Sequence, residues 1–195
     1  EGQGHIYALD VDPIESAKTK ERLEKQGFGE DILTVRLQNF ADIDLVSKEY
    51  GKKFDFILAD LGVSSMQIDN PERGFSYKVD GPLYLRMNPQ KGESAADRLK
   101  EVSYEELVGM LVENSDEPYA DKIAKVIIAE RRKCPIDTTN RLGEVIEKAL
   151  DFIPKNEKKD VWKKTCARVF QALRIDVNNE FEVLYEFMNK LPYAL

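Results

Sequence analysis

The sequence HIYALDVDPIE, residues 5–15, joins a strand to the start of a helix and decides the fold class. Residues 5–10 form a short apolar run that ends in an acid, which is typical of a buried parallel strand. Asp12 is a favourable helix cap, Pro13 suits the first helical position, and Glu15 completes a capping box. We therefore predict a strand followed by a helix that runs to about residue 26 and ends at Gly27.

The same alternation continues along the next 45 residues. Residues 32–37 (ILTVRL) predict a second strand, residues 42–50 a short helix ended by Gly51, and residues 54–60 a third strand that ends in Asp60. Strands and helices that alternate with short connections are the βαβ pattern of a doubly wound parallel sheet. The sequence therefore predicts an α/β fold.

The pattern changes after the third predicted strand. Residues 61–89 are rich in Gly, Ser, Asn, Asp and Pro, and a loop of that length is usually functional. Residues 94–150 have helical periodicity, and residues 155–164 form a mixed-charge stretch that we expect to be a solvated connector. A last helix is expected at residues 178–191, with Phe181, Leu184, Tyr185 and Met188 at core spacing. The clearest helices between are expected at 103–112, 120–132 and 138–150.

Two domains follow from this organisation. Residues 1–85 and 170–195 are assigned to the α/β domain, and residues 86–169 to an all-helical insertion domain. The first strand of a doubly wound sheet is central, and a glycine-rich nucleotide loop normally follows it. Gly2-Gln3-Gly4 precedes a strand instead, so we treat it as unrelated to that loop and expect a missing strand upstream, with the last strands also absent.

The composition narrows the function classes. The chain has 195 residues, is 42% hydrophobic and 33% charged, and carries a net charge of -7, which argues against nucleic-acid binding by bulk charge. No run of about 18 apolar residues predicts a membrane span, and no apolar signal region is visible, so we expect a cytoplasmic protein. Cys134 and Cys166 lie too far apart in sequence for a metal knuckle and fit a reduced compartment. The single histidine, His5, argues against zinc proteases, zinc sites of two cysteines and two histidines, and most histidine relays, so no metal site is expected.

Acids at strand ends are the first candidate site residues. Ligands of open α/β sheets bind beyond the carboxyl ends of the strands, where Asp10 and Asp60 are expected. Asp10 suits the ribose hydroxyls of an adenosine cofactor, because Asp12 already serves as the helix cap; Asp60 alone is a weak signal. Phe40, just after the second strand, could stack on an adenine or lie in the core.

Several separated motifs resemble one known family, the MraW-type ribosomal RNA cytosine-N4 methyltransferases. The resemblance covers nearly the whole chain, in order. The motifs are DLGVSSMQ (60–67), NPERGFSY (70–77), DGPL (80–83), RM (86–87), PIDTT (135–139), FQALRI (170–175) and VNNE (177–180).

The resemblance implies a Rossmann-like class I methyltransferase sheet and an enzyme that uses S-adenosylmethionine. Its expected substrate is the exocyclic amine of a cytosine in the decoding region of small-subunit ribosomal RNA, within the ribosomal particle. By the resemblance, Asp10 binds the ribose, Phe40 lies beside the adenine, and Asp60 and Gln67 contact the cofactor near its methionine end. The family's Gly-Gly-His loop would lie upstream and its Pro-Gly-Gly turn downstream. No membrane partner is expected, and the oligomeric state stays open, with a dimer as one option.

The chain departs from the family in two places. Residues 84–87 are Tyr-Leu-Arg-Met where the family usually has Asp-Met-Arg-Met. Residues 164–169 are Lys-Thr-Cys-Ala-Arg-Val where the family usually has His-Pro-Ala-Thr-Arg-Thr. A divergent paralogue with another target base is therefore an alternative.

The expected chemistry assigns roles to further residues. Asp60, with the backbone of residues 61–65, is the candidate acceptor for the hydrogens of the attacking amine, and a role for Asp60 in cofactor binding alone is the alternative. The candidates for RNA phosphate contacts are Arg73, Arg86, Arg168 and Arg174, with loop clamping as the alternative for each. Residues 131–133 and 155–164 are further candidate RNA contacts, or else solvated helix ends.

Two rival functions remain. An NAD-dependent dehydrogenase would also place Asp10 on a ribose, but the long loop after Asp60 and the lack of a hydride-relay histidine argue against it. A non-catalytic RNA-binding or assembly module is the other rival. Cofactor binding distinguishes the first rival from the methyltransferase.

Overall fold

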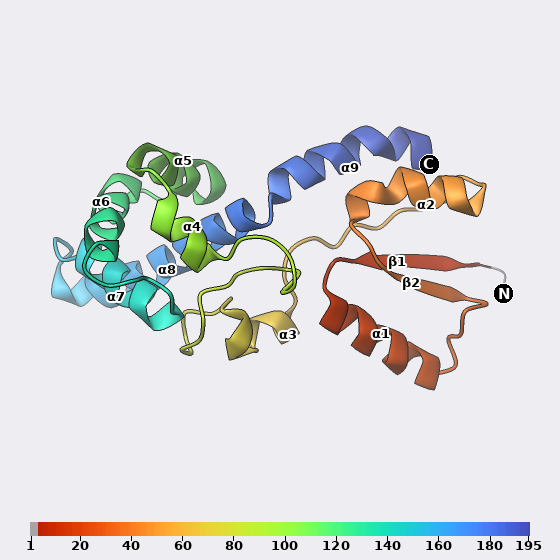
Figure 1. The fold of residues 1–195 in the computed structure, drawn as a ribbon, viewed down its shortest axis with the longest axis horizontal. Coiled ribbons are helices and arrows are strands. Elements are labelled where there is room, and N and C mark those ends of the chain that lie inside the picture. The colour runs from red at the N-terminus through yellow and green to blue at the C-terminus, as the bar shows by residue number, and fades with distance from the viewer. Residues whose placement is uncertain (1–3) are drawn as a thin grey trace. The chain divides into compact units, whose positions relative to one another are not determined.

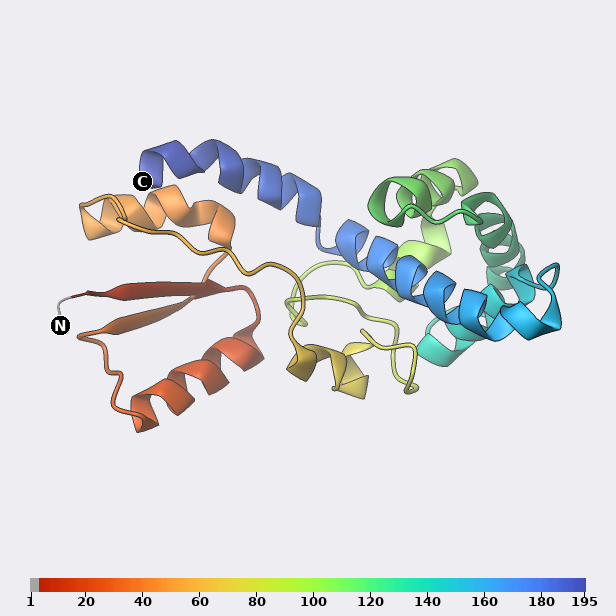
Figure 2. The same cartoon turned by 180° about the vertical axis from the view of Figure 1, so that it is seen from behind.

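The computed structural model describes residues 4–195, which divide into two compact units. The first unit comprises the residues up to Leu61 together with Glu180–Leu195, and the second is Gly62–Asn179. Both are drawn in Figure 1 and, from behind, in Figure 2.

A two-stranded parallel sheet lies at the centre of the first unit. Strand β1 (Ile6–Asp10) pairs with β2 (Leu33–Leu37), with Ile6 opposite Leu33 and Asp10 opposite Leu37. Helix α1 (Pro13–Lys25) covers one side of the strands, and α2 (Ile43–Tyr50) and α9 (Glu180–Ala194) pack together on the other (Figures 1 and 2). The predicted strands at 5–10 and 32–37 and the helix at 42–50 are confirmed.

Local signals explain where these elements begin and end. The Asp12 side chain accepts hydrogen bonds from the N–H groups of Ile14 and Glu15, at 2.9 and 3.3 Å, and so caps α1. The expected return bond from Glu15 is replaced, because the Asp12 N–H donates to Asp10 and the Glu15 carboxylate pairs with Lys18. Helix α2 ends at Gly51, which adopts the left-handed conformation with φ 72°.

The third predicted strand is wrong. Residues 54–60 are extended, but within residues 4–195 no backbone hydrogen bond joins them to β1, and the sheet has two strands. Their one described backbone bond runs from the Phe54 N–H to the carbonyl of Ala194, at 2.7 Å. Phe56 and Leu58 remain 76% and 79% exposed. A strand exists only through its partners, and this segment has none in the part of the chain that the structure describes.

Helix α9 supplies the core of the first unit with a different face from the expected one. Phe187 and Ala194 are buried with Ala41 and Ile43, whereas Phe181, Tyr185 and Met188 are exposed, so their predicted core positions are wrong. The helix carries two apolar stripes, and the one that includes Leu184, Phe187 and Leu191 faces α2. Spacing alone does not tell which stripe is buried.

The second unit is built mainly of helices. Two short turns lie in its long loop, α3 (Ser65–Ile68) and η2 (Pro71–Arg73). Four helices follow: α4 (Ala95–Glu101), α5 (Tyr104–Ser115), α6 (Ala120–Arg131) and α7 (Thr139–Ala149). The last three lie at or near their predicted positions, and α4 lies within the stretch of predicted helical periodicity. Ser103 and Thr138 cap α5 and α7 through their hydroxyls.

Helix α8 (Lys155–Val177) corrects the prediction of a connector at residues 155–164, since these are its first ten residues. Most residues of this stretch are charged or polar, so the helical repeat of its few apolar residues is difficult to recognise in the sequence. Two of the apolar residues, Val161 and Trp162, are half-buried. Nothing in the stretch after Pro154 breaks a helix.

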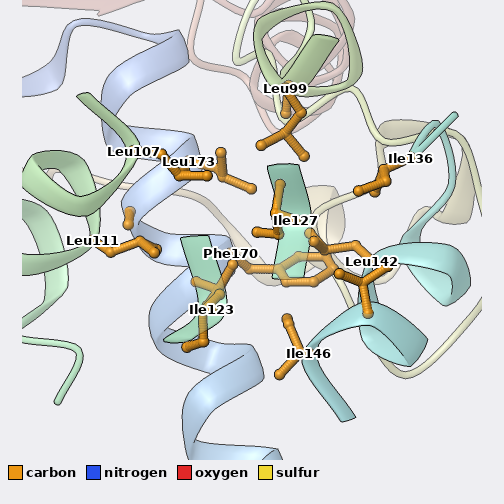
Figure 3. Packing of buried hydrophobic residues seen from close by; sticks show 14 of the residues in the cluster. Leu99, Leu107, Leu111, Ile123, Ile127, Ile136, Leu142, Ile146, Phe170 and Leu173 are labelled. Carbon is orange, nitrogen blue, oxygen red and sulfur yellow. The ribbon is translucent and has the colours of Figure 1, made fainter. Parts of the chain in front are cut away.

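Five helices of the second unit, α4 to α8, contribute to one apolar core (Figure 3). The figure shows side chains that converge from different helices, with Phe170 among its neighbours at the centre. The labelled residues include Leu107 and Leu111 from α5, Ile123 and Ile127 from α6, Leu142 and Ile146 from α7, and Phe170 and Leu173 from α8. None of the helices within residues 4–195 is long and apolar enough to span a membrane.

The units meet in sequence at 61/62 and 179/180, whereas the sequence placed the domain boundaries at 85/86 and 169/170. Two observations account for the difference. Loop residues Phe75, Leu83 and Leu85 are buried in the helical core, and α8 runs without interruption past residue 170. The loop and the end of α8 therefore belong to the helical unit.

Candidate functional site

The first unit contains a cleft of about 700 Å³ between β1 and the extended segment that follows α2. Residues 4–9 line one wall and residues 53–61 the other, with Phe40 and Phe187 among the remaining lining residues. The two walls run in the same direction (Figures 1 and 2). Asp10 ends β1 just beyond the first wall, and Asp60 lies near the end of the second wall. The two acids are therefore at the same end of the cleft.

Aromatic side chains dominate part of the cleft and were not singled out in the sequence. The Tyr7 ring lies 5.0 Å from the Tyr50 ring and 5.7 Å from the Phe54 ring, between centroids. All three residues line the cleft. Two ring partners of Tyr7, Tyr50 and Phe54, lie more than 40 residues away in sequence, so the sequence pattern gives no sign of this cluster.

Asp10 keeps acceptor capacity beside the cleft. Its Oδ1 accepts the Asp12 N–H at 2.9 Å, the neighbouring Val11 N–H also favours the carboxylate, and no side chain of residues 4–195 donates to it. Partial loss of hydration raises the pKa of this carboxyl, and the negative charges of Asp12 and Glu15 add to that rise, while hydrogen bonds from the Asp12 and Val11 N–H groups oppose it. The backbone around Asp10 is fixed by the start of α1, so the carboxylate is held in place.

Phe40 lines the cleft and also belongs to the core cluster, so both alternatives for it have support. Its ring meets Phe187 edge-on, with centroids 5.2 Å apart. The Asn39 side chain accepts the Ala41 N–H at 2.9 Å and fixes the turn that carries Phe40. Contact with an adenine stays a prediction.

Asp60 is exposed and lines the cleft. No hydrogen bond or ion pair engages its carboxylate within the described residues 4–195. The side chain is thus available to a ligand, and its roles in cofactor binding and in orienting the amine stay predictions.

Gln67 lies in the second unit, where its side chain caps the short helix α3. Its side-chain oxygen accepts the Ser64 N–H at 2.8 Å, while its own N–H donates to the Ser64 hydroxyl at 3.2 Å. This capping box closes the single turn of α3 and buries Gln67. Its contact with a cofactor stays a prediction.

Arg73 and Arg86 hold the long loop of the second unit together. The Arg73 guanidinium donates to the carbonyls of Arg86 and Met87, at 2.9 and 2.7 Å, and the residue is only 5% exposed. Arg86 donates to the carbonyl of Gly92 at 3.1 Å and lies over the Tyr84 ring. The geometry matches loop clamping, and RNA contacts by these two residues stay predictions.

The other two predicted arginines lie on α8. The Arg168 side chain is 40% exposed and lies 3.9 Å from the carboxylate of Glu117, which is buried. Arg174 is in the last turn of α8, where its carbonyl accepts a hydrogen bond from the Asn178 side chain at 2.8 Å. Arg168 retains surface through which it could contact RNA.

Asn178 is a loop-positioning residue that the sequence analysis did not identify. Its side chain donates to the carbonyl of Leu85 at 2.7 Å and accepts the Met87 N–H at 2.8 Å. Leu85 is buried with φ 55°, a strained conformation that the surrounding contacts must hold. Asn178 lies in the VNNE motif, so its motif was visible although its partners, about 90 residues away, were not.

Comparison with known proteins gives a consistent result. The model of the family described as "MraW methylase family" matches residues 1–195. The chain is 69% identical over 196 residues to "Ribosomal RNA small subunit methyltransferase H 1" of Agathobacter rectalis, covering 100% of this chain and 56% of the relative. It is 58% identical to "Ribosomal RNA small subunit methyltransferase H 2" of Alkaliphilus metalliredigens, covering 99% and 55%. It is 39% identical to "Ribosomal RNA small subunit methyltransferase H" of Heliobacterium mobile, covering 100% and 60%.

The chain thus spans little more than half the length of these curated relatives.

Proposed function

This chain belongs to the MraW methylase family, and we propose that it methylates the exocyclic N4 amine of a cytosine in small-subunit ribosomal RNA, with S-adenosylmethionine as the methyl donor. The names of the relatives support ribosomal RNA of the small subunit as the substrate. We assign the first unit to the methyltransferase domain and the helical unit to an inserted domain. A cytoplasmic location and action within the ribosomal particle are part of the proposal.

One observation of the fold carries the proposal: Asp10 and Asp60 follow two co-directional chain segments at the same end of an aromatic-lined cleft. The carboxyl ends of parallel strands are where α/β proteins bind nucleotides. A carboxylate there can accept hydrogen bonds from both hydroxyls of a ribose, and no side chain of residues 4–195 donates to Asp10. The residues present therefore fit an adenosine cofactor.

The cofactor supplies, when bound, a methyl group already activated by a positively charged sulfur. The protein's task is then to hold the two reactants in line and to exclude competing water. We assign ribose binding to Asp10, a place beside the adenine to Phe40, and contacts near the methionine end to Asp60 and Gln67.

Asp60 is also proposed to orient the attacking amine. The lone pair of an exocyclic cytosine amine is delocalised into the ring, so an acceptor for its hydrogens makes attack easier. The Asp60 carboxylate is exposed on the cleft wall, and the backbone of residues 61–65 follows it directly. The Arg73 and Arg86 clamps, together with Asn178, hold the loop on which this backbone continues.

Calorimetry of S-adenosylmethionine binding, paired with methyl transfer to small ribosomal subunits, tests the proposal. Asp10→Asn should weaken cofactor binding by roughly 10- to 100-fold, because a charge-assisted hydrogen bond to the ribose is lost. Asp31→Asn, an exposed acid in the same unit, is the matched control and should bind normally. Binding of NAD in place of S-adenosylmethionine would support a dehydrogenase instead.

Asp60→Asn separates the two roles of Asp60. Slower methyl transfer with unchanged cofactor affinity supports amine orientation. If Asp60→Asn instead abolishes cofactor binding, the result supports only the cofactor role of Asp60, because the loss of cofactor by itself explains a slower methyl transfer.

A further inference from the structure

A second cavity, of about 340 Å³, lies in the helical unit, on the surface shared by α7 and the first turns of α8. Its lining residues are Glu147 of α7 and Lys155, Lys158, Lys159 and Trp162 of α8. The four α8 residues have the spacing i, i+3, i+4 and i+7, which places them on one face of the helix. The cavity belongs to no part of the proposed methyl-transfer site.

The cavity lies beside a basic stretch of a protein that is acidic as a whole. Residues 155–164 contain five lysines and two acids, whereas the whole chain has a net charge of -7. Lys158 is partly neutralised by Asp151, at 2.7 Å. Lys155 and Lys159, by contrast, have no ion-pair partner within residues 4–195, so their charges are available to a ligand.

Trp162 gives the cavity a flat apolar wall. Its ring nitrogen donates to the carbonyl of Gly143 at 3.0 Å, and its ring meets Tyr77 edge-on with centroids 5.8 Å apart. These contacts fix the ring while part of it stays exposed. Ammonium groups beside a fixed aromatic surface are the combination by which proteins hold single-stranded nucleic acid.

We propose that this cavity, the α7–α8 basic pocket, binds the backbone of a single-stranded segment of RNA. Lys155 and Lys159 contact phosphates, and the exposed part of Trp162 packs against a base or sugar. Glu147 would repel a phosphate but can accept a hydrogen bond from a ribose 2′-hydroxyl, which favours RNA over DNA. The biological meaning rests on the proposed function, in which the substrate is ribosomal RNA, but the binding itself can be measured apart from methyl transfer.

Trp162 is the only tryptophan of the chain, so its fluorescence reports on the pocket directly. The experiment titrates the 195-residue chain with a cytidine oligoribonucleotide of about 12 nucleotides, long enough to cross one such site. The same titration uses the matching oligodeoxyribonucleotide, inorganic phosphate at equal phosphate concentration, and polyglutamate. We expect saturable quenching by the RNA, weaker quenching by the DNA, and none by phosphate or polyglutamate.

Paired variants test the lysines. Lys155→Gln with Lys159→Gln should weaken RNA binding roughly tenfold at low salt and reduce the slope of log K against log salt by about 1.4, the value for two single-strand phosphate contacts. Lys100→Gln with Lys125→Gln removes the same charge from α4 and α6 of the same unit, where each lysine pairs with an acid. This control should leave the affinity within about twofold and the slope unchanged.

Three results would overturn the inference: RNA that leaves the fluorescence unchanged, test and control variants that weaken binding equally, or a response to phosphate or polyglutamate that matches the RNA response. Methyl transfer separates this inference from the proposed function. A protein that binds RNA in the pocket but transfers no methyl group would refute only the proposed function. Normal transfer with no RNA contact at the pocket would refute only the inference.

Discussion

The carboxylate of Glu130 on α6 links helices α6 and α7. It accepts hydrogen bonds from Lys133 at 2.7 Å, from Lys148 of α7 at 2.8 Å, and from Arg141 of α7 at 2.9 Å. These three bonds lower its pKa from 4.5 to about 2, with Lys133 the largest cause, followed by Lys148 and Arg141. The ionised form is therefore favoured by folding.

We predict that Glu130→Gln lowers the urea midpoint at pH 7. Because the folded-state pKa is depressed, the contribution of Glu130 is complete above the ordinary pKa of 4.5 and is lost as the pH falls toward 2. The difference between wild type and variant should therefore shrink between pH 5 and pH 3. Glu144→Gln is the control, because the Glu144 side chain is 67% exposed and, within residues 4–195, its carboxylate pairs only with Arg141, at 3.4 Å. A constant difference across this pH range would contradict the assignment.

Asn178 is the second residue with a specific prediction. Asn178→Ala removes its bonds to the Leu85 carbonyl and the Met87 N–H, and should cost about 1–3 kcal/mol of unfolding free energy. Methyl transfer should fall as well, since the loop that follows Asp60 loses its clamp. Asn140→Ala, an exposed control on α7, should change stability by less than about 0.5 kcal/mol. Equal stability of the two variants in urea would rule out the clamp.

At the scale of elements, the loop of the second unit crosses itself at a point where a side chain has no room. A Cβ on Gly81 would lie 2.0 Å from the carbonyl oxygen and 2.9 Å from the carbonyl carbon of Pro71, and both of these are backbone atoms. The Gly81 N–H also donates to the Thr139 hydroxyl, and its carbonyl accepts the Thr139 N–H. The loop and the start of α7 are thus held together at one glycine.

Gly81→Ala should therefore destabilise the protein by about 1–3 kcal/mol or more, because the Gly81 backbone is tied to Thr139 and the Pro71 carbonyl accepts the Gly74 N–H. Gly109→Ala on α5 is the opposite case, with open space around the added carbon, and should stabilise by about 0.5–1 kcal/mol. Thermal unfolding of the two variants measures both effects. Stabilisation by Gly81→Ala would contradict the described crossing.

Features that depend on residues close in sequence could be predicted, whereas features that depend on distant residues could not. Helices α5 and α7 were predictable because Ser103 and Thr138 cap them locally and their apolar residues repeat at helical spacing. Residues 54–60 were not, because strand formation depends on a partner segment and not on the alternation of the segment itself. In the same way, Asp10 was placed correctly at a strand end, whereas the carbonyls that Arg73 binds lie 13 and 14 residues away along an irregular loop.

In the whole molecule, cofactor binding is proposed mainly for the first unit, and binding of single-stranded RNA is proposed for the second. The first unit offers an aromatic cleft with Asp10 at the end of β1 and Asp60 at the end of an extended segment, and the second offers a basic pocket on α8. A net charge of -7 gave no sign of such a pocket, because it sums over both units. Charge that matters for RNA is local, since screening limits its reach to about 8–10 Å.

The most direct test of the proposed activity is mass spectrometry of nucleosides from small-subunit ribosomal RNA. Cells that lack this gene are compared with cells that carry it and with cells complemented by the Asp10→Asn variant. We predict the loss of one N4-methylated cytidine on deletion, its return with the wild-type gene, and its absence or strong reduction with Asp10→Asn. Unchanged methylation of every cytidine in the deleted strain would contradict the proposed function.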